Sequence, residues 1–96
     1  MPKGYIIGHL NIQNMEAFRV GYASKVGDLV SEVGGKFLVR GGNVAYREGD
    51  KADLDVVAEF PDIGTAEAFL ASDSYKAIEP ARKENTTGLF KLVEGV

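Results

Sequence analysis

The chain has 96 residues, 45% of them hydrophobic, and a formal net charge of -3. This length suits a single domain over residues 1–96, and this composition supports a packed core rather than a disordered chain. Acidic and basic residues are interspersed without a basic run, which argues against nucleic-acid binding, and the lack of cysteine excludes disulfides, thiolate nucleophiles and zinc–thiolate sites.

The first predicted element is a strand over residues 4–12, GYIIGHLNI. Alternation puts small and apolar residues on one face, namely Ile6, Gly8, Leu10 and Ile12. The other face is mixed and carries Tyr5, Ile7, His9 and Asn11. A sheet covered by helices on one side has this pattern. Because no apolar run is long enough for a signal peptide or a membrane span, we expect a cytoplasmic protein without membrane contact.

A helix is predicted over residues 15–33, with Asn14 as its N-cap, because an asparagine side chain accepts a hydrogen bond from the first helical turn. Apolar residues recur every three or four positions, as in an amphipathic helix, namely Met15, Phe18, Tyr22, Val26, Leu29 and Val33. Gly34-Gly35 should end the helix, since glycine accepts the left-handed backbone found at helix C-termini.

A short strand, KFLVR at residues 36–40, precedes a second glycine pair, Gly41-Gly42. The pair has two interpretations. In the first, it is a tight hairpin turn that leads into a fifth strand. In the second, it is a bend in one long strand, so that residues 43–47 pair antiparallel with residues 54–60 across a hairpin loop, REGDKAD. The second is favoured because REGDKAD is rich in residues typical of hairpin loops.

The second half of the chain is predicted to form a strand, a helical region and a final strand. Residues 54–60, LDVVAEF, alternate as a strand, and Asp62 can cap the helix that follows. Ser72 can cap a further helical turn, which Pro80 should kink or break. Residues 88–94, GLFKLVE, close the chain as a strand.

These elements follow the order βαββαβ, which predicts a ferredoxin-like α+β fold with one antiparallel sheet and both helices on one face. The opposite face is then bare and carries residues such as Ile7 and His9. Bare apolar sheet surface usually marks a partner interface, and a self-complementary homodimer is the commonest solution.

Five stretches also carry a family resemblance: KGYIIGHLNI, GGKFLVRGG, EFPD, SDSYKAI and LVEGV. Together they resemble domain-of-unknown-function family 1330 (DUF1330), a small bacterial family, over nearly the whole chain. The resemblance implies a dimeric α/β barrel, in which two ferredoxin-like subunits pack their sheets face to face. The wider superfamily includes cofactor-free monooxygenases, muconolactone isomerase-like enzymes and dye-decolorising peroxidases. Catalytic residues differ between these branches, so none is transferred to this chain.

His9 is the only histidine and the only side chain that ordinarily titrates near neutral pH, which makes it the candidate catalytic base. The alternative is a structural residue in a dimer interface. Glu59 shares the parity of the same sheet face and is a candidate partner that would orient the imidazole. One histidine is too few for a typical catalytic zinc site, and no EF-hand-like acidic loop is present, so neither a metal nor a cofactor is expected.

Three further residues are candidate ligand-binding groups. Arg40 precedes the second glycine pair, where a bend would turn its guanidinium into a cleft to bind a carboxylate; the alternative is a surface or interface salt bridge. Tyr75 and Arg82 are seven residues apart and would share one side of a helix that survives Pro80. They would then frame a pocket mouth, or else Tyr75 packs in the core and Arg82 is solvated.

Two functional hypotheses follow. In the first, a homodimer binds a small organic molecule in a cleft of the barrel, with or without a cofactor-free monooxygenase- or isomerase-like reaction. In the second, the protein is a non-catalytic interaction module whose mixed sheet face only supports dimerisation. A pocket lined by His9 or Arg40 favours the first hypothesis, and a tightly filled interface favours the second.

Overall fold

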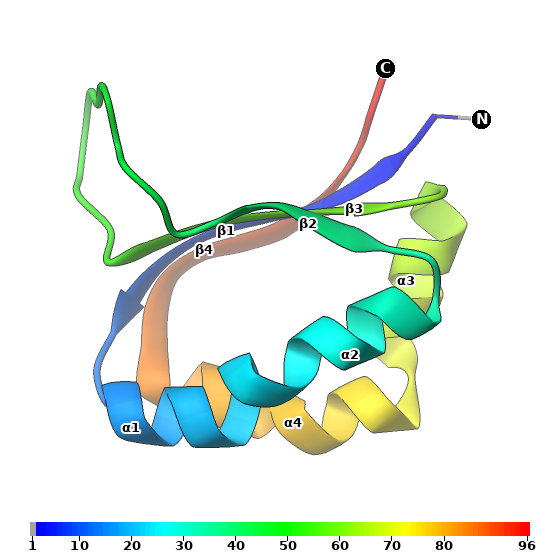
Figure 1. Ribbon diagram of the computed structural model, residues 1–96, viewed down its shortest axis with the longest axis horizontal. Helices are drawn as coiled ribbons and strands as arrows, with labels where there is room; N and C mark the ends of the chain where they lie inside the picture. Colours follow the sequence, from blue (N-terminus) through cyan, green and yellow to red (C-terminus); the bar gives the residue numbers. More distant parts are fainter. Residues whose placement is uncertain (1) are drawn as a thin grey trace.

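Four antiparallel strands form one sheet, in the order β2-β3-β1-β4, in a computed structural model that describes residues 2–96. The strands are β1 (Gly4–Ile12), β2 (Lys36–Arg40), β3 (Leu54–Phe60) and β4 (Thr86–Glu94). The helical segments are α1 (Met15–Phe18), η1 (Arg19–Ala23), α2 (Ser24–Glu32), α3 (Ile63–Ala71) and α4 (Asp73–Asn85). All of them lie on one side of the sheet (Figure 1). The predicted ferredoxin-like α+β fold is therefore confirmed.

The two faces of β1 differ as the alternation predicts. Ile6 and Leu10 are buried beneath the helices, while Tyr5, Ile7 and His9 are only partly covered. Burial of an aliphatic side chain of this size stabilises the fold by roughly 1.5–3 kcal/mol. Residues 2–96 place no second layer on the face opposite the helices (Figure 1).

The first helical segment contains a π-helical turn that its sequence spacing explains. Four buried side chains recur at intervals of four residues, namely Phe18, Tyr22, Val26 and Val30. In an α-helix each step of four residues rotates the side chain by about 40°, so the stripe would turn away from the sheet. The wider turn at η1 takes up part of this rotation, and all four side chains stay in the core.

Both ends of this segment have the predicted caps. The Asn14 side chain accepts a hydrogen bond from the Ala17 backbone N–H at 3.0 Å. At the other end, the Gly34 N–H donates to the Ser31 carbonyl and the Gly35 N–H donates to the Val30 carbonyl, each at 3.0 Å. With φ of +79° at Gly34, this is a Schellman motif, and it satisfies carbonyls that the helix leaves unpaired.

The caps predicted for the second half are also present. The Asp62 carboxylate accepts from the Thr65 N–H at 2.7 Å, and the Ser72 hydroxyl accepts from the Tyr75 N–H at 3.2 Å. The backbone and side-chain hydrogen bonds of Thr65 lower the pKa of Asp62, which keeps the cap charged. These local signals begin α3 and α4 where the sequence places them.

Of the two predicted effects of Pro80, a kink or a break, the break does not occur. Pro80 lies inside α4, which continues to Asn85. Proline removes one helical hydrogen bond, but Tyr75 and Ile78 before it and Arg82 after it are buried. Tertiary packing on both sides of Pro80 therefore holds the helix together.

Both interpretations of Gly41-Gly42 are wrong. The strand KFLVR pairs directly with β3, from Lys36 opposite Glu59 to Arg40 opposite Val56, with an irregular step between Phe37 and Val39. The chain then leaves the sheet at the two glycines, whose φ values are +77° and +96°, and residues 41–53 form a long irregular loop. No strand forms over residues 43–47, because the glycines turn the chain out of the plane of the sheet.

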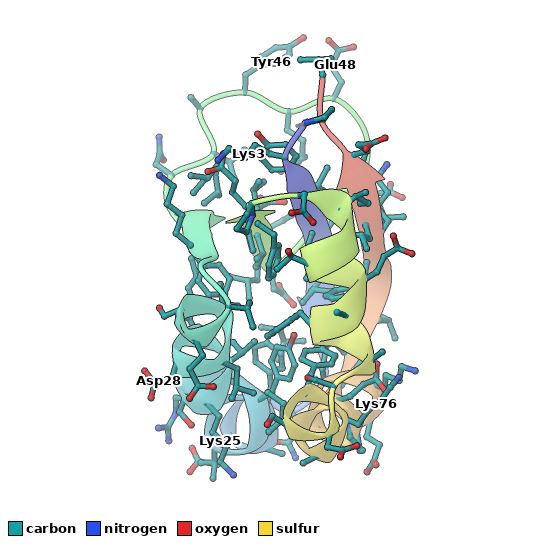
Figure 2. The ribbon with its side chains drawn as sticks, turned by 90° about the vertical axis from the view of Figure 1, so that its right-hand side faces the viewer. Lys3, Lys25, Asp28, Tyr46, Glu48 and Lys76 are labelled. Carbon is teal, nitrogen blue, oxygen red and sulfur yellow. The ribbon has the colours of Figure 1, made fainter. Side chains whose placement is uncertain are left out.

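This loop rises on the side of the sheet away from the helices (Figure 1). Tyr46 and Glu48 lie at its far end, at the opposite end of the molecule from Lys25 and Asp28 (Figure 2). The base of the loop is anchored to β1, since the Asp53 carboxylate accepts from the Ile12 N–H at 2.8 Å. The loop thus flanks the uncovered face of the sheet.

Gly41→Val should destabilise the protein by about 1–3 kcal/mol, because valine strongly disfavours a positive φ. The Gly41 N–H also donates to the Asp55 carbonyl at 2.8 Å, so a change of backbone conformation would break a contact with β3. Lys51→Ala, in an exposed part of the same loop, is the control and should change stability by less than about 0.5 kcal/mol. Urea denaturation measures both, and equal midpoints for the two variants would contradict the explanation.

Candidate functional site

An apolar cavity of about 40 Å³ lies between the sheet and the helices. It has room for roughly three water molecules. The wall combines the helix-facing side of β1 and β3 with the buried stripe of the first helical segment and the end of β2. Only two of its residues, Tyr22 and Arg40, carry polar side-chain groups.

The cavity exists because small residues stand where the core would otherwise be filled. Gly8 at the middle of β1, Ala23 at the end of η1 and Ala58 on β3 all line it. A Cβ atom placed on Gly8 would stand 3.5 Å from the Val56 Cβ, which is an ordinary van der Waals contact. Alanine would therefore fit at this position and would occupy part of the space.

Arg40 borders the cavity where β2 ends. Its guanidinium lies 4.6 Å from the ring centroid of Phe37 and donates a hydrogen bond to the Ala23 carbonyl. Gly27 makes room for it, since a Cβ atom there would come within 3.3 Å of the Arg40 Nη1 atom. The side chain is exposed, so Arg40 lies between the cavity and solvent. The binding of a carboxylate by Arg40 stays a prediction.

Tyr75 and Arg82 do not frame a pocket mouth but form a buried polar chain with Tyr22. The Tyr22 and Tyr75 hydroxyls are 2.9 Å apart, and the Arg82 Nε–H donates to the Tyr75 hydroxyl at 3.2 Å. Tyr75 is fully buried, as one alternative predicted, whereas Arg82 is only 8% exposed and the expected solvation is wrong. The Arg82 guanidinium lies 3.7 Å from the ring centroid of Phe90, which shields it from solvent.

The positive charge of Arg82 is only weakly compensated by nearby carboxylates. Its nearest carboxylate is that of Glu79, at 3.9 Å, and the same carboxylate also faces Lys76 at 3.3 Å and Lys83 at 3.7 Å. Burial raises the pKa of Tyr22, and the neighbouring Tyr75 raises it further. The Tyr22 hydroxyl therefore remains protonated at physiological pH.

His9 lies on the opposite face of the sheet from the cavity. Its Nδ1 atom is 2.9 Å from the Asp55 carboxylate and its Nε2 atom is 3.3 Å from the Asp50 carbonyl in the loop. Both partners are acceptors, so both contacts are hydrogen bonds only when the imidazole is protonated. Because Gly8 faces the cavity and side chains alternate along a strand, His9 cannot touch a molecule held there.

The expected pairing of His9 with Glu59 is wrong. The antiparallel register places Glu59 opposite Tyr5 and Asp55 opposite His9. The Tyr5 hydroxyl donates to the Glu59 carboxylate at 3.2 Å. Both acidic residues have the same parity in LDVVAEF, so the sequence alone could not tell which of them faces the histidine. Sequence reasoning also missed Tyr22, whose only signal was a phenol within an otherwise apolar helical stripe.

The one-sided arrangement of helices on an antiparallel sheet defines a ferredoxin-like α+β protein. The chain belongs to the family described as a domain of unknown function, DUF1330, which matches residues 3–96. The family resemblance of the sequence is thus confirmed. No curated protein matches the chain.

Several solved structures share the fold. A protein of unknown function from Rhodopseudomonas palustris has a TM-score of 0.71 at 11% identity, over 97% of this chain and 80% of that one. SnoaB, a cofactor-independent oxygenase from Streptomyces nogalater, has a TM-score of 0.66 at 17% identity, over 97% and 92% of the two chains. An antibiotic biosynthesis monooxygenase has a TM-score of 0.54 at 13% identity, over 100% and 97%. Likeness at these identities shows the fold alone.

Two features of residues 2–96 bear on the nature of the site. No group of three or more histidine, cysteine or acidic side chains is arranged to hold a metal ion in this part of the chain. No helix formed by these residues is long and apolar enough to cross a membrane. The expectation that the protein works without a metal or cofactor stays a prediction.

Tyr75→Phe should lower the free energy of unfolding by about 1–3 kcal/mol, because it leaves the Arg82 Nε–H buried without its acceptor. Tyr46→Phe is the matched control: it removes the same hydroxyl from a side chain that is 78% exposed, and its effect should be below about 0.5 kcal/mol. Urea denaturation of both variants measures the difference. Equal shifts in the midpoint would show that the buried chain contributes no stability.

Proposed function

We propose that this protein binds a small, largely apolar organic molecule in the cavity between the sheet and the helices. The cavity itself is the observation that carries the proposal. Protein cores are normally packed to the density of organic crystals, and a void of about 40 Å³ costs on the order of 1 kcal/mol of stability. One methyl group at Gly8 would reduce that cost, so the empty space has a use that offsets it.

The composition of the wall sets the character of the ligand. Aliphatic and aromatic side chains supply most of the surface, which favours an apolar body. Tyr22 and Arg40 supply the polar contacts. The exposed Arg40 side chain is the natural point of entry, because it borders both the cavity and solvent and is held mainly by the Ala23 carbonyl and the Phe37 ring.

A cofactor-free reaction of the monooxygenase or isomerase type is the alternative function. The His9–Asp55 pair is the group that would serve proton transfer in such a reaction. It faces away from the cavity, so it would act only on a molecule bound at the uncovered sheet face. For this reason ligand binding in the cavity is the function that the geometry favours.

The uncovered face supports a homodimer as the second part of the proposal. Apolar side chains are exposed there on two strands, namely Val39 on β2 and Leu89 and Val93 on β4, and Val57 on β3 is half-buried between them. Acidic Asp55 and Glu59 share this face with basic Lys36 and Lys91, so two copies related by a two-fold axis can oppose unlike charges. The cytoplasmic location expected from the sequence stays a prediction.

Gly8→Ala should abolish ligand retention, because its methyl group projects into the cavity. The variant should also be about 0.5–1 kcal/mol more stable, since glycine within a strand is disfavoured. The measurement is mass spectrometry of small molecules that the protein retains after exposure to an extract of the cells that make it. Gly64→Ala, at the exposed start of α3, is the control and should retain the same compounds as the wild type. Retention by Gly8→Ala, or no retention by the wild type, would refute cavity binding.

Leu89→Glu should convert the proposed dimer to monomers, because it replaces an exposed apolar side chain of the uncovered face with a charge. Val20→Glu is the control, since Val20 is 52% exposed on η1 and Leu89 is 48% exposed on β4. Multi-angle light scattering at micromolar protein concentration measures the molar mass of each variant in solution. A monomeric wild type, or a Leu89→Glu variant that stays dimeric, would contradict the sheet-to-sheet interface.

A further inference from the structure

The buried chain of Tyr22, Tyr75 and Arg82 contains one more proton than its internal hydrogen bonds use. The Arg82 Nε–H donates to the Tyr75 oxygen, and a single hydrogen bond joins the two hydroxyls. That bond uses the proton of one hydroxyl only. Among the hydrogen bonds of residues 2–96, none takes up the proton of the other hydroxyl.

The position of the two rings decides where the spare proton lies. Tyr75 is fully buried and is not part of the cavity wall, whereas Tyr22 is part of that wall. If Tyr22 donated to Tyr75, the spare proton would point into packed protein, where an unpaired donor is penalised. If Tyr75 donates to Tyr22, the spare proton belongs to Tyr22, whose side chain is part of the cavity wall. The second arrangement is therefore favoured.

This arrangement also makes Tyr22 a strengthened donor. The direction of donation runs from Arg82 to Tyr75 and from Tyr75 to Tyr22, and each bond polarises the next. Among residues 2–96, the one carboxylate within ion-pair distance of Arg82 is that of Glu79 at 3.9 Å, so the Tyr22 end of the hydrogen-bonded cluster favours the negative end of a dipole. Burial and the neighbouring Tyr75 raise the pKa of Tyr22, so the group donates rather than ionises.

We propose that the ligand of the cavity is a small carbonyl compound, a ketone or aldehyde with apolar substituents, whose oxygen accepts a hydrogen bond from Tyr22. This inference rests on the proposed binding function and specifies its ligand class. Apolar wall residues enclose the substituents, and Tyr22 recognises the oxygen. Arg40, the other polar residue of the wall, is also a donor and suits the same kind of ligand.

Two probes of the same shape test the assignment. 2-Butanone carries a carbonyl oxygen where 2-methyl-1-butene carries a methylene group, and xenon reports on the apolar space alone. Binding of each is measured from backbone amide NMR shifts of residues that line the cavity. The wild type should bind the ketone about tenfold more tightly than the alkene, which corresponds to roughly 1.4 kcal/mol.

Tyr22→Phe should remove this preference while leaving the xenon and alkene responses unchanged, because only the hydroxyl is lost. Tyr46→Phe, which removes an exposed hydroxyl from the loop, should keep the full preference. If Tyr22→Phe does not fold, the selectivity of the wild type between the two isosteres still tests whether the cavity prefers a carbonyl oxygen.

The outcomes separate this inference from the function on which it rests. If xenon and the alkene bind to the wild type but the ketone has no advantage, the carbonyl assignment is wrong and cavity binding stands. The same conclusion follows if Tyr22→Phe weakens the ketone and the alkene equally. If none of the three probes shifts the amides of the cavity wall, both the carbonyl assignment and the cavity-binding function are wrong.

Discussion

The alternation of side chains along β1 is the constraint on which the rest of the structure depends. β1 pairs along its length with β3 on one side and β4 on the other, so its two faces become the two faces of the sheet. Ile6 and Leu10 anchor the helices, and Gly8 between them leaves space. His9, one residue further on, points the other way. The separation of cavity and histidine follows directly from this period of two.

A local irregularity in the first helical segment keeps its apolar side chains directed at the sheet. The π-helical turn at η1 keeps a stripe with four-residue spacing facing the core, and it lies where Tyr22 and Ala23 line the cavity. Single π-helical turns within α-helices often mark functional sites because they cost stability. Here the irregular turn, the missing side chain at Gly8 and the exposed Arg40 meet around one small space, which is why the site is placed there.

Membership of DUF1330 and the likeness to solved structures agree on the fold, and neither establishes the chemistry. One structure of the same fold is a cofactor-independent oxygenase and another is a protein of unknown function. A shared fold at such low identity carries many functions, so function has to be argued from the site. In this chain the site is an apolar cavity whose wall includes Tyr22 and Arg40, while His9 lies on the other face of the sheet.

The sequence by itself determined most of the elements and several of their ends. The strands at residues 4–12 and 54–60 and the caps at Asn14, Asp62 and Ser72 are where local chemistry predicts them, because alternation and capping depend only on neighbouring residues. Tertiary structure alone decided the partners. Strand register places His9 opposite Asp55 instead of Glu59. Helix packing buries Arg82, and it allows α4 to continue past Pro80. Register and packing arise from contacts between residues far apart in the chain, and no local pattern encodes them.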